Sequence, residues 1–590
     1  MTMAADPAGG IVGRRALMTG VGALAGMAGW FLVDELPDLV DSDRLVLFLT
    51  AGFGAFFFAL LAASGALALR AAVAVAALVS VPAAGLLTWA SLRHAEIDDF
   101  LEPGHPLVAF GLIVFLTLPF LIVGFRPGER WRSYPALFRQ SWDIAVRYAA
   151  AWIFTGAFWA VLFLSDALLG LVGLEIIEDI LDIDFMPPVL TGAALGLALA
   201  VVAELSDYIS PFLILRLLRL LVPVVLVVTV VFLGALPLRG LSDLFGGLSA
   251  AAVLLAMAVG IATLITAVID REDAEAADAG LLRLSSQALA VAIPLLSGLA
   301  LYAVWLRVSD YGWSPDRIAA ACAGAVGMGY GVLYTAAVIL RRDWMERIRR
   351  ANIAMALAVI GLAALWLTPV LNAESLSARN QVARYASGKV GAEALDLWFI
   401  GRELGLAGEA ALDRLRAAAG DDADVLDARL ARLETASYRW DFDAADRETT
   451  ATDATNARIV EIVSAVAVAP EGRRLDPALL AGAAMPQLST WLSACGRRTP
   501  GGNPGCVVLF ADLLPEVPGD EAILFTMNAA GNISLTALNA EGFQALRFLR
   551  GAPVDLAPAT LDRVLDGSVT VGEPALRSLD LGGAEVLILP

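Results

Sequence analysis

The sequence holds few of the side chains that usually carry enzyme chemistry. It has two histidines, three cysteines and a single lysine, Lys389, in 590 residues. It contains no G-x-x-x-x-G-K-[ST] phosphate loop, no H-E-x-x-H metal motif, no G-x-S-x-G nucleophile elbow and no paired C-x-x-C motif. These absences argue against an ATP-driven transporter and a zinc protease. The net charge of −19 argues against a nucleic-acid partner.

Apolar residues are present in large excess. They make up 58% of the chain, the mean hydropathy is +0.73, and they form uninterrupted runs of about twenty residues, the length needed to cross a bilayer as a helix. We count eleven such runs between residues 16 and 371, and prolines leave the count open by one between residues 186 and 236. The sequence therefore predicts an all-α polytopic transmembrane bundle of about eleven spans over residues 1–371.

Arginines in the short loops predict the orientation of this bundle, because basic residues next to spans stay in the cytoplasm. Alternate loops hold seventeen arginines against five in the other set. The seventeen are Arg14, Arg15, Arg70, Arg126, Arg130, Arg132, Arg139, Arg147, Arg216, Arg219, Arg271, Arg283, Arg341, Arg342, Arg347, Arg349 and Arg350; the five are Arg44, Arg93, Arg239, Arg307 and Arg317. The excess of Arg over Lys is typical of high-GC bacteria. We expect a bacterial inner-membrane protein with a cytoplasmic N-terminus.

One span follows the last arginine-rich loop, so the rest of the chain is predicted to be periplasmic. Residues 372–437 carry an apolar stripe at helical spacing and predict a helical neck. Residues 438–590 predict an α/β (α+β) domain. Its expected strands are residues 506–510, 522–527, 533–538 and 585–589, with a hairpin turn at 528–532, and its expected helices are 541–551 and 559–567.

Two of the three cysteines bracket a ten-residue loop rich in Gly and Pro. We expect Cys495 and Cys506 to form a disulfide in an oxidising periplasm, which stabilises by about 3 kcal/mol on the loop-entropy model. The alternative is a pair of buried free thiols. The only histidines, His94 and His105, are far from them in sequence, and their spacing matches no metal-ligand pattern. We expect no metal and no cofactor.

A group of charged residues lies close to the expected membrane. Glu204, Asp207, Arg216 and Arg219 flank Pro211 at helical spacings, and a reentrant hairpin would pair them and line a polar cavity. The alternative is a cytoplasmic amphipathic turn whose arginines extend to the lipid headgroups. Both interpretations stay open at this point.

Two stretches, RVSDYGWSPDRI and LNAESLSARNQVARYASGKVGAEALDLWFIGRELGLAGEAALDRL, resemble a bacterial membrane family described as domain of unknown function 4153. The resemblance covers about residues 130 to 420. Tyr311, Gly312, Trp313 and Arg317 match the family's Tyr-Gly-Trp-[Ser/Thr]-x-x-Arg element, with Ser314 in the variable position. The resemblance implies a polytopic inner-membrane protein without an assigned activity. From the residues alone, Ser314 is expected to cap a helix that begins at Pro315.

Three functions remain compatible with these features. The first is a non-enzymatic cell-envelope protein with a binding, scaffold or signalling role, whose periplasmic domain contacts an envelope protein, lipid or glycan. The second is a transporter or a translocase for a lipid-linked substrate that uses the charged group around Pro211. The third is a membrane-bound glycan or lipid transferase that uses the carboxylates Asp98, Asp99 and Glu102 of an outer loop. The lipid bilayer is a partner in all three.

Overall fold

A computed structural model describes residues 7–204, 211–239, 249–513, 519–539, 542–544, 556–572, 578–580 and 585–587. Its chain divides into two compact units, residues 1–430 and 431–590. Eleven helices of the described residues are long and apolar enough to cross a membrane, so the chain is a multi-pass membrane protein. They are α1 (Pro7–Trp30, continued to Leu39), α3 (Asp43–Ala63), α4 (Leu69–Ser91), α6 (His105–Gly124), α7 (Tyr134–Gly170), α9 (Met186–Glu204), α10 (Pro211–Arg239), α11 (Ala250–Ile269), α12 (Gly280–Tyr311), α13 (Pro315–Ile339) and α14 (Trp344–Trp366).

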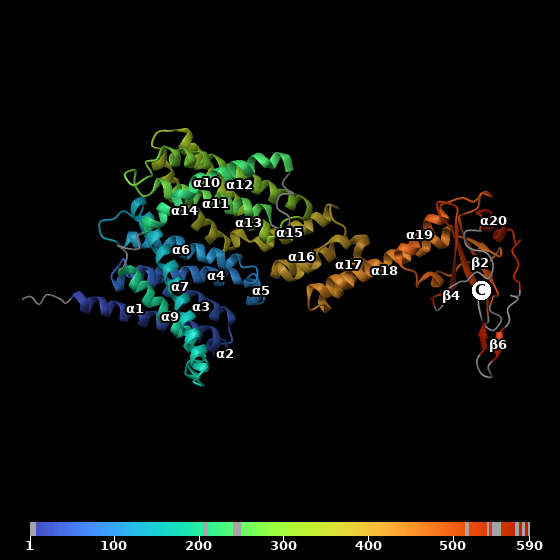
Figure 1. Ribbon diagram of the computed structural model, residues 1–590, viewed down its shortest axis with the longest axis horizontal. Helices are drawn as coiled ribbons and strands as arrows, with labels where there is room; N and C mark the ends of the chain where they lie inside the picture. The colour runs from blue at the N-terminus through green and yellow to red at the C-terminus, as the bar shows by residue number, and fades with distance from the viewer. Residues whose placement is uncertain are drawn as a thin grey trace, which may run out of the picture. The chain divides into compact units, whose positions relative to one another are not determined.

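Shorter helices complete the first unit (Figure 1). They are α2 (Leu36–Leu39), α5 (Ile97–Leu101), α8 (Ile176–Leu181), α15 (Ala373–Ala386), α16 (Gly405–Ala417) and α17 (Ala423–Thr435). The unit boundary falls inside α17, so α15 and α16, which lie in the segment 372–437 predicted as a neck, belong to the same compact unit as the spans.

The spans pack in three groups. One core joins α3, α4 and α6 with the end of α14, and a second joins α10, α11, α12 and α13 with the start of α14. The third joins α1 and α9 with α7. In this last group the backbones of α1 and α9 touch: a Cβ added at Gly22 would lie 2.0 Å from the carbonyl oxygen of Gly192, and one added at Gly192 would lie 2.1 Å from that of Gly22. Small residues permit such close approach between spans.

Loops on one side of the bundle carry most of its arginines, and we call it the arginine-rich side; it includes the loops after α3, α6, α11 and α13. Arg349, from the arginine-rich stretch 341–350, is only 4% exposed. It donates hydrogen bonds to the carbonyls of Ile269 (2.6 Å) and Asp270 (3.2 Å) and pairs with Asp273. It therefore satisfies carbonyls that the end of α11 leaves without intrahelical partners.

The second unit contains a five-stranded sheet in the order β1 to β5. Strand β1 pairs in parallel with β2, and the other neighbours are antiparallel. Its elements are α18 (Arg439–Ala465), β1 (Ala467–Ala469), α19 (Met485–Cys495), β2 (Cys506–Ala511), β3 (Glu521–Met527), β4 (Ile533–Asn539), β5 (Gly542–Gln544), α20 (Ala559–Leu565) and a separate pair, β6 (Ser578–Asp580) with β7 (Glu585–Leu587).

Alternation along the strands sends side chains to both faces of this sheet. Val508 and Leu524 pack with α18 and α19 on one face, whereas Val507 and Phe525 pack with α20 on the other. The first three expected strands and the hairpin turn are confirmed, as is α20; of the last expected strand, 585–589, residues 585–587 are described and form β7. The helix expected over 541–551 is wrong at residues 542–544, which pair with β4 as a strand, and the rest of it lies outside the described residues.

Candidate functional site

An elongated cavity lies inside the first unit, between the two larger groups of spans. Its volume is about 660 Å³, and its walls come from α6, α7, α11, α13 and α14, with Ile293 of α12. Within the described part of the chain, no aspartate, glutamate, lysine or arginine lines it. Ligand pockets in proteins usually measure about 300 to 1,000 Å³, so the cavity has room for a small organic molecule.

The cavity follows α14 for most of that helix. Its wall residues run from Asn352 near the arginine-rich side to Trp366 at the opposite end. A helix rises about 1.5 Å per residue, so these fourteen steps span about 21 Å, against about 30 Å for the hydrocarbon core of a bilayer. The cavity is therefore longer than one lipid leaflet.

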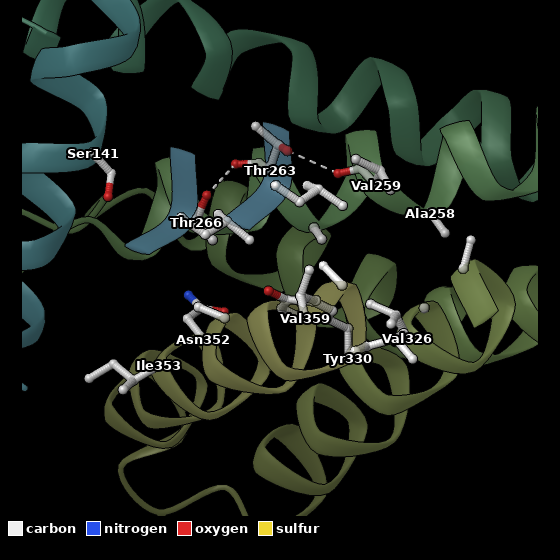
Figure 2. Close-up of a pocket in the computed structure, with 18 of the residues that line it drawn as sticks. Ser141, Ala258, Val259, Thr263, Thr266, Val326, Tyr330, Asn352, Ile353 and Val359 are labelled. Carbon is white, nitrogen blue, oxygen red and sulfur yellow. Dashed lines mark hydrogen bonds between the residues drawn. The ribbon is translucent and has the colours of Figure 1, made fainter. Parts of the chain in front are cut away.

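Polar groups gather at the end of the cavity near the arginine-rich side. Asn352 Nδ2 donates to Tyr134 Oη (3.1 Å), and Tyr334 Oη donates to Asn352 Oδ1 (2.5 Å), so one residue from each of α7, α13 and α14 forms a chain. The hydroxyls of Tyr330 and Ser141 line the same region. Figure 2 shows Asn352 and Tyr330 on one wall and the α11 wall across from them.

The α11 wall is less polar than its sequence suggests. Thr263 donates its hydroxyl to the carbonyl of Val259 (2.9 Å), and Thr266 donates to that of Thr263 (2.6 Å), as the dashed lines of Figure 2 show. Both hydroxyl protons are therefore used within their own helix. These threonines therefore offer a ligand their methyl groups and the remaining acceptor lone pairs of their hydroxyls, but no proton.

The far end of the cavity is lined by an imidazole and an indole. Trp366 Nε1 donates to His105 Nδ1 at 3.3 Å, and the two rings meet edge to face. A neutral imidazole whose Nδ1 accepts must carry its proton on Nε2. His105 Nε2 is buried and has no partner among the described residues.

Directly beyond this end, the loop after α4 is fixed to the helices that follow the last span. Arg93 pairs with Glu374 (3.2 Å) and donates to the carbonyls of Trp366 (2.7 Å) and Thr368 (2.8 Å). Both side chains of the ion pair are less than 10% exposed. The Arg93 carbonyl accepts from the Leu406 amide at 3.0 Å. This loop therefore holds both α15 and the start of α16 against the bundle.

His94 lies beside that ion pair and is 2% exposed. Neither of its ring nitrogens has a hydrogen-bond partner among the described residues. Burial lowers the pKa of the imidazole, while the nearby Glu374 and Asp99 carboxylates oppose this shift. Gly405, at φ +53°, leaves room for the ring, because a Cβ there would lie 2.7 Å from His94 Cδ2. The two histidines of the chain thus both lie at this end of the bundle.

The two stretches that resemble the family meet in the structure. Asn380 Oδ1 accepts from the Trp313 amide (2.9 Å), and Gln381 donates to the Tyr311 carbonyl (3.1 Å). The element also has an internal hydrogen bond, in which Arg317 donates to the carbonyl of Gly312 at 2.7 Å. Gly312 itself has φ +81°. The Tyr311, Gly312, Trp313 and Arg317 element therefore fixes α15 to the α12–α13 turn.

The expected cap and helix start next to this element are confirmed. Ser314 accepts from the Arg317 amide at 3.3 Å, and Pro315 is the first residue of α13.

The charged group predicted around Pro211 is not brought together as a cluster. Glu204 pairs with Arg15 of α1 at 2.5 Å. Arg219 pairs with Asp270 and donates to the carbonyl of Ala267, at the end of α11. Arg216 is exposed, and Asp207 lies outside the described residues. These partners could not be found from local spacing, because they are 189 and 51 positions away.

The predicted disulfide is present. Cys495 at the end of α19 is joined to Cys506 at the start of β2, and both side chains are buried. The enclosed loop is anchored to α20 by Asp562, which accepts hydrogen bonds from Thr499 Oγ1 (2.5 Å), Asn503 Nδ2 (2.8 Å) and the Gly501 amide (3.0 Å). These bonds, led by that from Thr499, lower the pKa of the Asp562 carboxyl. In the described ranges no group of three or more His, Cys, Asp or Glu is placed to hold a metal ion.

The sequence did not reveal the cavity. Its walls are alanines, valines and leucines that look like those of any buried span, and its polar groups are single residues on helices far apart in sequence. The one available signal was the set of polar residues within or near apolar runs, Ser141, Tyr330 and Asn352 among them.

Comparison with known proteins gives one match. A model of the family described as "Domain of unknown function (DUF4153)" matches residues 46–415, which includes ten of the eleven spans together with α15 and most of α16. No curated protein and no solved structure matches the chain.

Proposed function

Because the chain belongs to the DUF4153 family, whose description assigns no activity, we propose a function from its own geometry: the helical bundle binds a lipid-like molecule in the bacterial inner membrane. One observation carries this proposal, namely the elongated cavity of about 660 Å³ between two separately packed groups of spans. Its walls are apolar and uncharged through most of their length. A water-soluble ion or sugar would find few polar partners there, whereas a hydrocarbon chain fits such walls.

The orientation is part of the proposal. The N-terminus and the arginine-rich side face the cytoplasm, and the second unit lies in the periplasm. Arginine bias supports this orientation, and the Cys495–Cys506 disulfide supports an oxidising compartment for the second unit. Alkaline phosphatase fused after Pro590 is expected to be active in cells. A fluorescent protein that folds only in the cytosol, fused at the same position, is expected to show no fluorescence. The reverse pattern would overturn the orientation.

Filling the cavity tests the binding proposal. Ala356 of α14 lines the cavity, whereas Ala358, two residues further along the same helix, is exposed on the bundle surface. Ala356→Trp is expected to remove the lipid that co-purifies with the protein, while Ala358→Trp retains it, at equal yield of folded protein. The measurement is mass spectrometry of lipids extracted from the purified protein. Equal lipid content in the two variants would contradict the proposal.

A second candidate is a translocase that moves a lipid between leaflets. One observation in its favour is the length of the cavity, about 21 Å, which exceeds the thickness of one leaflet. The cavity also lies between two separately packed groups of spans, whose relative movement would let a lipid pass. In proteoliposomes, a translocase would speed the transfer of a fluorescent lipid to the outer leaflet, and Ala356→Trp would abolish that increase. Binding without transfer would leave the simpler binding role.

A role through the second unit alone, as an envelope scaffold, has less structural support. Its described residues form two well-packed cores on the faces of the sheet, and the disulfide loop is bonded to its own α20. For the transferase hypothesis, Asp98, Asp99 and Glu102 do not line the cavity.

A further inference from the structure

The bilayer itself limits what the apolar part of this cavity can select. Lipid tails are as apolar as the leucines and valines of the wall, so a molecule already dissolved in the membrane gains little from contact with them. Selectivity must then come from the few polar groups in the wall. The chemistry of the ligand is therefore set by the polar groups that still lack hydrogen-bond partners. This inference about the ligand rests on the proposed binding function.

The unmet groups are hydrogen-bond donors. Tyr330 Oη and Ser141 Oγ line the cavity and have no hydrogen-bond partner among the described residues. Tyr134 Oη accepts from Asn352, so its own proton remains available to donate. Asn352 Oδ1 already accepts from Tyr334. All three hydroxyls can donate, so a ligand with oxygen acceptors completes these bonds.

Charge is absent from the walls, and this constrains the ligand further. A charged group near the middle of a membrane costs several kcal/mol unless a partner of opposite sign compensates it. The described wall residues include no arginine, lysine, aspartate or glutamate. Arg349 is close in sequence to Asn352, but its guanidinium is used by Asp273 and by the carbonyls at the end of α11. The acceptors of the ligand are therefore uncharged oxygens, such as ester, carbonyl or hydroxyl groups.

The polar groups also set a direction. The hydroxyl donors of Tyr134, Ser141 and Tyr330 lie at the end near the arginine-rich side, and the wall from there to the far end is mostly apolar until His105 and Trp366. We infer that the cavity binds a neutral amphiphile, an uncharged lipid with a long chain and oxygen acceptors, whose polar end lies between Tyr134, Ser141 and Tyr330 and whose chain runs along α14 to Trp366. His105 Nε2, at the far end, is also a donor without a partner among the described residues, but it has almost no accessible surface and so does not face the open space of the cavity.

Three probes with the same chain and a diazirine at the chain end test this inference in proteoliposomes. One is a monoacylglycerol, the second an alkyl sulfate with a permanent charge, and the third a plain hydrocarbon. The monoacylglycerol is expected to bind at least about fivefold more tightly than the other two. Its chain-end crosslinks are expected on residues near Trp366 and His105, as mapped by mass spectrometry.

Tyr330→Phe removes one donor with little change of shape, and Tyr302→Phe is the matched control, because Tyr302 of α12 is 52% exposed and does not line the cavity. Loss of one hydrogen bond to a neutral acceptor corresponds to a dissociation constant that is roughly three- to tenfold larger. We expect this loss for the monoacylglycerol in Tyr330→Phe, no change for the hydrocarbon, and no change for either probe in Tyr302→Phe.

The outcomes separate the two proposals. Tighter binding of the alkyl sulfate, chain-end crosslinks near Asn352, or equal affinity in Tyr330→Phe would overturn the inference while cavity labelling still supports lipid binding. If no probe labels the cavity and Ala356→Trp changes nothing, both the inference and the proposed function fail.

Discussion

The two units of the chain are held together in different ways. In the first unit, α1 and α9 approach each other closely at Gly22 and Gly192, and buried arginines such as Arg93 and Arg349 bond to backbone carbonyls. In the second unit, branched and aromatic side chains fill both faces of a sheet, and a disulfide closes the loop before β2. The first unit relies on backbone proximity and satisfied polar groups, and the second on apolar burial and a covalent link.

This difference matches the solvent expected around each unit. Within hydrocarbon there is little gain from moving an apolar side chain from lipid to protein, so packing and hydrogen bonds decide how spans associate. In water, burial of apolar surface is the main favourable contribution to folding. If the comparison is correct, substitutions that separate backbones will disrupt the first unit most, and substitutions that remove links will affect only the second.

The largest effect is expected from Gly22→Leu. A Cβ at this position would meet the Gly192 carbonyl oxygen at 2.0 Å, and a backbone atom cannot rotate away. Overpacking usually costs about 1–3 kcal/mol, and we expect a loss above this range, because α1 must leave α9. Gly20→Leu on the same helix is the control, since a Cβ there meets nothing within 4 Å. The measurement is the thermal midpoint of the detergent-purified protein. Similar midpoints for the two variants would show that α1 does not pack against α9.

Removal of the disulfide is expected to have the next largest effect. A chain with Cys495→Ala and Cys506→Ala should lose about 3 kcal/mol, because the unfolded second unit regains the freedom of its loop. Amide hydrogen exchange in β2, β3 and β4 is expected to accelerate, and exchange in the spans is expected to stay the same. Cys322→Ala, in α13, is the matched control. Faster exchange in the spans as well would mean that the two units do not unfold separately.

Much of the local structure followed from sequence. A span is recognised from its own twenty residues, a hairpin from the turn at 528–532, and a disulfide from two cysteines around a flexible loop, because each depends on contacts that are close along the chain. The family was also identified correctly, and Ser314 was assigned as a cap from its position before Pro315.

Long-range partners did not follow from sequence. One of the two open interpretations placed Glu204 and Arg219 near each other because they are close along the chain, yet each pairs with a residue far away in sequence. Likewise, the resemblance rested on two stretches about 60 residues apart, and nothing in either one indicated that Asn380 and Gln381 would bond to the turn at Trp313. The cavity depends on six helices at once. Such features need the packing angles of the spans, which apolar periodicity does not specify.

The smallest effect, and the sharpest test of whether the disulfide loop belongs with α20, is expected from Asp562→Asn. Oδ2 of Asp562 accepts from the Gly501 amide, and an asparagine that keeps the bonds from Thr499 and Asn503 would face that amide with an NH₂ group instead. At this solvent-open site the loss of stability is about 1 kcal/mol.

The pH dependence of stability gives a second measurement at the same site. Because the folded pKa of Asp562 is lowered, its contribution to stability is present above the unfolded pKa, about 3.9, and is lost as the pH falls through the folded value. Stability of the second unit in Asp562→Asn should therefore fall less steeply on acidification below about pH 4, whereas Glu471→Gln, at an exposed acid, should follow the unsubstituted protein. Identical acid profiles for all three proteins would mean that the loop does not depend on α20 and that the disulfide alone holds it.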